Sequence, residues 1–115
     1  MTNPKRGELK IVLGKKKYKG KVTLDVVMRI ERQMGKGIVK IAQSLSEADI
    51  SATEIINILT PVIRAGGNDI DDKEVGKAVW EAGLAQGIAG CSEIIAQALG
   101  AGGDEGNEEE AEALL

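Results

Sequence analysis

The spacing of apolar residues changes once along this chain, close to residue 23. From Glu8 to Val22, apolar and polar residues alternate, which is the period of a β-strand. Beyond Thr23, apolar residues recur at intervals of three and four, which is the period of an amphipathic helix. A chain of 115 residues can build one modest core. The pattern therefore predicts one α+β domain, in which a short sheet is followed by helices.

Residues 8–22 are predicted to form a two-stranded antiparallel β-hairpin that turns at Gly14-Lys15-Lys16. Its two faces differ: one carries Leu9, Ile11 and Leu13, and the other carries Lys17, Lys19 and Lys21. Two strands alone are marginally stable in water, so the apolar face is expected to pack on helices.

Four or five mostly short helices are predicted after the hairpin. Thr23 is the expected N-cap of the first helix, and Gly35 or Gly37 is its expected end. The predicted buried stripe of this helix consists of Leu24, Val27, Met28, Ile30 and Met34. A second, shorter helix carries its apolar stripe on Ile38, Ile41, Ala42 and Leu45.

The remaining helices are predicted mainly from their ends. Ser51 and Glu54 have the spacing of a capping box and open a third helix that reaches about Ala65, with a kink or a shifted boundary expected at Pro61. Its predicted buried residues are Ile55, Leu59, Val62 and Ile63. The run Asp71-Asp72-Lys73-Glu74, with three acidic residues, opens a fourth helix that runs to about Gln86, with Val75, Val79 and Ala82 facing the core. A fifth helix is predicted over roughly Ser92 to Leu99, burying Ile94, Ile95, Ala98 and Leu99.

Glycine and acidic residues dominate the end of the chain, from Gly100 to Leu115. Such a composition buries too little apolar surface to offset the entropy of ordering a segment. The predicted organisation is therefore one domain over residues 1–99 and a disordered acidic tail over residues 100–115.

Aromatic residues are nearly absent from this chain. It has no Phe, and its only aromatic residues are Tyr18 and Trp80. The core must therefore be aliphatic, which favours packed helices over a sandwich of sheets. Gly76 and Gly83 precede and follow Trp80 by four and three residues, and we expect the indole to anchor the core rather than to form a binding hot spot.

No residue pattern points to catalysis or to a cofactor. The chain has no His, so an imidazole base or metal ligand is excluded. Cys91 is the only cysteine and is expected to pack as a small hydrophobic residue at the start of a helix. The acidic run 68–72 lacks the glycine and the later Glu of a calcium loop, so helix capping explains it better. We predict no catalytic, cofactor-binding or metal-binding residues, and no membrane span, because no run of eighteen apolar residues occurs.

Charge is distributed very unevenly along the chain. Residues 1–40 contain 12 basic and 3 acidic residues, and residues 41–115 contain 3 basic and 15 acidic residues. The asymmetry is consistent with self-association, with a basic face for an acidic partner, or with a solubilising role alone. Electrostatic contact of the hairpin with nucleic acid is a weaker alternative, because only Tyr18 could stack on a base and the overall pI is acidic.

Several segments together resemble the tail protein family first defined in gene transfer agents, with related sequences in siphophage-like prophages. The N-terminal part of the resemblance lies in Asn3-Pro4-Lys5-Arg6-Gly7-Glu8 and in Glu31-Arg32-Gln33-Met34-Gly35-Lys36-Gly37. The later part lies in Ser51-Ala52-Thr53-Glu54-Ile55, Ile63-Arg64-Ala65-Gly66-Gly67, Asp72-Lys73-Glu74-Val75-Gly76 and Glu81-Ala82-Gly83-Leu84. The resemblance covers residues 3–99, and the acidic tail lies outside it.

The resemblance implies a small non-enzymatic protein whose gene lies among tail genes, near that of the tape-measure protein. The family is grouped with phage tail assembly chaperones, although some descriptions call it a tail tube protein. A chaperone of this kind is expected to coat the tape-measure protein in the host cytoplasm until tube subunits replace it, and it can have a longer, frameshifted form. Two alternatives remain: a structural tail component that stays in the particle, and a small nucleic-acid-associated regulator that uses the basic hairpin.

Overall fold

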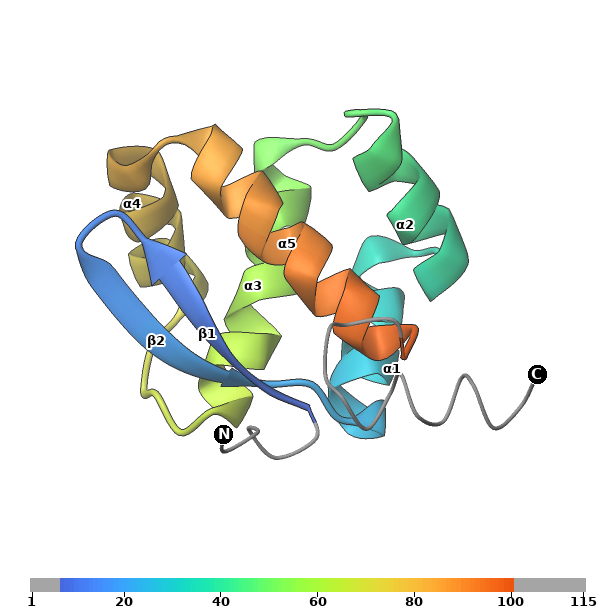
Figure 1. Ribbon diagram of the computed structural model, residues 1–115, viewed down its shortest axis with the longest axis horizontal. Coiled ribbons are helices and arrows are strands. Elements are labelled where there is room, and N and C mark those ends of the chain that lie inside the picture. The colour runs from blue at the N-terminus through green and yellow to red at the C-terminus, as the bar shows by residue number, and fades with distance from the viewer. Residues whose placement is uncertain (1–6, 101–115) are drawn as a thin grey trace, which may run out of the picture.

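The computed structural model describes residues 7–100 and has the predicted α+β architecture (Figure 1). The sheet consists of β1 (Glu8–Leu13) and β2 (Lys16–Lys21). The helices within the described residues are α1 (Leu24–Met34), α2 (Ile38–Ser46), α3 (Ala52–Ala65), α4 (Asp72–Ala82) and α5 (Leu84–Ala98). Apart from Gly100, the predicted acidic tail lies outside the described residues.

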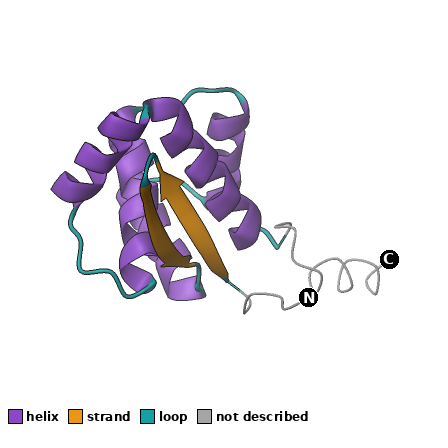
Figure 2. Ribbon diagram, turned by 60° about the vertical axis from the view of Figure 1, so that its left-hand side comes forward, coloured by secondary structure: helices purple, strands orange, loops and turns teal. Residues whose placement is uncertain are grey.

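The hairpin lies against the helices (Figure 2), and Ile11 and Leu13 of its apolar face belong to the same buried core as the helix residues, as predicted. Its strands are antiparallel, and Ile11 pairs with Tyr18 and Leu9 with Gly20. Ile11 and Leu13 are buried, whereas the lysines of β2 are exposed. A Cβ atom on Gly20 would lie 2.8 Å from Cγ1 of Val62, so glycine at this position allows β2 to approach α3 closely.

Helix α3 forms the centre of the fold, in contact with α1, α4, α5 and β2 (Figure 1). The predicted residues of its buried side are confirmed, and the structure adds Ile58. The helix runs through Pro61 to Ala65, so its boundary is not shifted at the proline, and the kink, the other expectation, stays a prediction. Proline removes one backbone donor from the helix, and the packing of α3 on four neighbouring elements offsets this cost.

The predicted helix caps are confirmed. The backbone N–H of Val26 donates to the Thr23 hydroxyl at 3.3 Å, and Gly35 ends α1 with a φ of 71°. Ser51 and Asp71 each form a capping box with a glutamate three residues later, at the starts of α3 and α4. These local signals set four helix ends correctly, because a cap is satisfied within one turn of the chain.

The boundary between α4 and α5 was predicted wrongly. Helix α4 ends at Ala82 rather than near Gln86, and α5 already begins at Leu84 rather than near Ser92. Gly83 has a φ of 100°, a conformation that favours glycine, and the chain changes direction there. Gly87 and Gly90 lie inside α5. A Cβ on Gly87 would lie 3.0 Å from Cγ2 of Ile55, so this glycine serves close helix packing rather than a turn.

The buried face of α1 also differs from the predicted stripe. Val26 and Ile30 are buried, whereas Leu24 is 73% exposed and Met28 is 43% exposed. Periodicity identified the helix correctly but not which of its apolar residues meet α3. That choice depends on how α1 is rotated against its neighbours, which spacing along one helix does not specify.

Trp80 does not anchor the core, which corrects the sequence-based expectation. Its side chain is 76% exposed on α4, and the core consists of aliphatic residues with Cys91. Leu99, which was expected to be buried, is also exposed. Cys91 is buried as expected, but it lies inside α5 rather than at the start of a helix.

Candidate functional site

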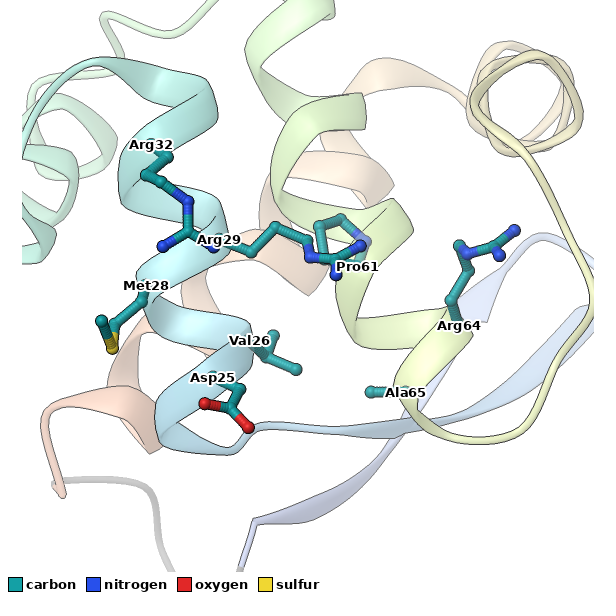
Figure 3. A pocket seen from close by; sticks show the side chains of 8 residues that line it. All are labelled: Asp25, Val26, Met28, Arg29, Arg32, Pro61, Arg64 and Ala65. Atoms are coloured by element: carbon teal, nitrogen blue, oxygen red, sulfur yellow. The ribbon is translucent and has the colours of Figure 1, made fainter.

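An open groove of about 420 Å³ lies between α1 and α3 (Figure 3). Its lining residues come from these two helices only: Asp25, Val26, Met28, Arg29, Arg32, Pro61, Arg64 and Ala65. Of the α1 residues in this lining, Val26 is buried, and Asp25, Met28, Arg29 and Arg32 are exposed. The groove therefore combines a small apolar floor with three guanidinium groups.

The three arginines come from different turns of the two helices. Arg29 and Arg32 are one turn apart on α1, and in Figure 3 the Arg29 side chain extends towards Pro61 on α3. Arg64 lies near the end of α3 and donates from Nη1 to the carbonyl oxygen of Ile70 at 2.7 Å. Among residues 7–100, the ion pairs are Lys19 with Glu8 and Lys36 with Glu54, so none of them engages an arginine of the groove.

A smaller hollow of about 220 Å³ adjoins this groove and shares Arg29, Pro61 and Arg64 with it. Asp71 and Asp72 border the hollow at the start of α4, and its two arginines, Arg29 and Arg64, come from α1 and α3. Thr60 also lines this hollow, and its buried hydroxyl has no hydrogen-bond partner within the described part of the chain. A buried hydroxyl without a partner costs free energy, which makes this position a candidate donor to a bound group.

Part of the chain's surface outside the groove is also basic. The hairpin carries an open hollow of about 450 Å³, lined by Glu8, Leu9, Lys10, Lys17, Tyr18 and Lys19. The exposed lysines here confirm the predicted basic face. Lysine ammonium groups on an exposed strand are strongly hydrated and bind carboxylates less selectively than the planar guanidinium of arginine.

The sequence matches the model of one protein family along nearly its whole length. That family is described as phage tail tube protein, GTA-gp10, and the match covers residues 6–112. The chain belongs to this family. The match continues past residue 99, where the resemblance was expected to end, so the acidic segment up to residue 112 falls within it. No curated protein and no solved structure matches the chain.

Between residues 7 and 100, no three His, Cys, Asp or Glu side chains gather into a group that could hold a metal ion. Burial raises the pKa of the Cys91 thiol to about 12, so it stays protonated at neutral pH. In the same range, no helix has both the length and the apolar character needed to cross a membrane.

The arginine-lined groove was missed by sequence reasoning. Arg29 and Arg32 are three residues apart, so their common face on α1 could have been found from the sequence. Arg64 lies more than 30 positions further along, in a different helix. Its proximity to α1 depends on the packing of α1 against α3, for which the sequence carries no local signal.

Proposed function

We propose that this protein is a non-catalytic tail assembly chaperone that binds the tape-measure protein during tail morphogenesis. Membership of the family makes it a phage-tail-related protein. The observation that favours a chaperone over a tube subunit is the small sheet: the described residues contain one sheet of two six-residue strands. A tube wall requires strands that close into a ring with neighbouring subunits, and the described residues offer two short strands packed on helices.

The surface of α1 supports a role in holding an amphipathic partner. Leu24 and Met28 are apolar and exposed, and they lie on the same helix as Arg29 and Arg32. A helical segment with an apolar stripe and flanking acidic residues could lie against this surface in the way that amphipathic helices bind grooves. Reversible binding is favoured by a small apolar area edged by charges, because a large apolar interface would be permanent.

The proposed partners are the tape-measure protein and, during replacement, the tail tube protein. The proposed place of action is the cytoplasm of the bacterial host, where tails assemble. Self-association of the chain on the tape measure is compatible with the opposite charges of its two parts, since basic residues 1–40 could face acidic residues of a neighbouring copy.

A second candidate function is a structural tail component that remains in the particle, and the description of the family as a tail tube protein favours it. The two roles differ in the fate of the protein after assembly. A chaperone must leave before the tail is complete, whereas a structural component is retained at a fixed number of copies.

Quantitative mass spectrometry of purified particles and of lysate from the same producing cells separates these roles. We expect abundant protein in the lysate and none in the particles, with the tape-measure protein as the internal standard for intact tails. Retention at a constant ratio to the tape-measure protein would overturn the chaperone proposal and establish a structural role.

A further inference from the structure

We infer that the groove between α1 and α3 binds the acidic C-terminal segment of the same chain, residues 104–115. This inference concerns a contact within one molecule and is tested without the tape-measure protein, with which the segment would compete for the same α1 surface. It rests on charge complementarity, on the apolar residues beside the groove and on where the described chain ends.

The charges of the groove and the segment are opposite. The groove lining has three arginines and one aspartate, Asp25, a net charge of +2. Residues 101–115 contain six acidic residues and no basic one: Asp104, Glu105, Glu108, Glu109, Glu110 and Glu112. A guanidinium group can hold a carboxylate through two parallel hydrogen bonds, which a lysine ammonium group cannot do. The groove therefore suits closely spaced carboxylates better than the lysines of the hairpin do.

The segment and the surface beside the groove both carry apolar residues that could contact each other. The segment ends in Ala113-Leu114-Leu115, directly after its last acidic residue. Leu24 and Met28 are exposed on α1, and Figure 3 shows Met28 on the side of α1 that faces away from α3. Acidic residues lying along the arginines would bring the two terminal leucines within reach of this apolar pair. Covering exposed leucine and methionine side chains adds a favourable hydrophobic contribution to the ionic one.

The described chain ends at a place from which the groove can be reached. Figures 1 and 3 both show the end of α5 next to α1. The described residues continue only to Gly100, two positions beyond α5. Eight further residues in an extended conformation span up to about 28 Å. Helix α1 has 11 residues and is therefore about 16 Å long, so a segment of this span is long enough to extend along it.

Nuclear magnetic resonance of the full-length chain tests the contact. The ¹⁵N-labelled wild type is compared with a full-length variant in which all six acidic residues of the segment become amides (Asp104→Asn, Glu105→Gln, Glu108→Gln, Glu109→Gln, Glu110→Gln and Glu112→Gln). We expect shift differences at the backbone amides of α1 and at the Nε–H groups of the three groove arginines. These differences should shrink by roughly half or more between low salt and about 0.5 M salt, because salt screens exposed charges.

Matched charge reversals localise the contact. The double variant Arg29→Glu/Arg32→Glu should lose the difference between acidic and neutralised segments, whereas Lys15→Glu/Lys40→Glu, with the same change in net charge away from the groove, should keep it. Circular dichroism checks that each variant is folded, and Arg32→Glu alone replaces the double variant if that one unfolds. Unchanged groove resonances would overturn the inference. So would shifts confined to the hairpin, or shifts that grow with protein concentration and so report binding to a second copy.

Discussion

Helices α1 and α3 lie side by side and are both amphipathic, yet they differ in how much of their apolar surface they bury. Helix α3 has seven buried residues in 14, and α1 has two in 11. Helix α3 is in contact with three helices and a strand, whereas α1 makes its main contact with α3. The comparison teaches that similar periodicity can serve two purposes. In α3 it forms the core, and in α1 it leaves apolar and basic side chains exposed.

The largest expected effect is the loss of stability that a cavity beside α3 would cause. Ile58 is fully buried, so Ile58→Ala should lower the free energy of unfolding by about 2–5 kcal/mol, the range for large-to-small changes in cores. Chemical denaturation followed by circular dichroism measures this loss. A loss below about 1 kcal/mol would mean that α3 is not the centre of the core.

Cys91, whose thiol packs against α3, gives a second test of the buried core through the pH dependence of stability. Burial raises the pKa of Cys91 to about 12 from 9.0, and its Sγ lies 3.7 Å from the carbonyl oxygen of Ile55. The folded state therefore keeps a proton that the unfolded state loses, and stability should fall as pH rises from about 9 towards 12.

The measurement for Cys91 is the dependence of unfolding free energy on pH, compared with that of Cys91→Ala. The alanine variant should show a shallower decline above pH 9, since it lacks the titrating group. In the wild type at pH 8, an aromatic disulfide reagent should modify the thiol rapidly only after denaturant is added. Rapid modification of the folded protein would contradict the burial of this side chain.

The next effect concerns the close approach of the hairpin to the end of α3. A Cβ on Gly66 would overlap the backbone carbonyl of Lys19, so Gly66→Ala should destabilise the fold by about 1–3 kcal/mol. Gly90→Ala is the matched control, because its Cβ would lie 3.4 Å from Leu59, an ordinary contact, and alanine favours helix. Equal thermal stability of the two variants would show that β2 does not pack tightly on α3.

A smaller effect is expected from the capping box of α3. Ser51→Ala removes the acceptor for the Glu54 N–H at 3.1 Å and should cost about 1 kcal/mol. The hydrogen bond from the Ser51 backbone N–H, with help from Lys36, lowers the pKa of Glu54. Ionised Glu54 therefore contributes to the stability of the folded state above pH 4.5, the ordinary pKa of this group. The contribution is lost as the pH falls from 4.5 through the lowered pKa of the folded state. Glu54→Gln should reduce this acid dependence in urea denaturation measured at several pH values.

The smallest expected effect is on the exposed side of α1. Leu24→Ala and Met28→Ala should each change the free energy of unfolding by no more than about 0.5 kcal/mol, as is usual for surface positions. The same variants should weaken tape-measure binding in a pull-down assay, with Val39→Ala, an exposed apolar residue on α2, as the control. A large loss of stability would place these residues in the core and remove the contrast between α1 and α3.

The sequence alone determined the parts of this protein that depend on neighbours within one turn or one hairpin. The alternation of Leu9, Ile11 and Leu13 sets the face of β1, and Thr23, Ser51 and Asp71 set three helix starts. Each of these features is stabilised by groups a few residues apart, so the pattern of residue types is sufficient to predict it. The family also followed from the sequence, through the match over residues 6–112.

Only the tertiary structure decided the features that depend on packing between distant segments. Glycines 83, 87 and 90 look alike in the sequence, but the first ends α4 with a positive φ and the others lie within α5. The exposure of Trp80 and Met28 depends on which face of each helix meets the core. The arginine-lined groove exists because α1 packs beside α3, which brings Arg64 close to Arg29. Such contacts are selected by the packing of the whole core, and a local pattern does not contain that information.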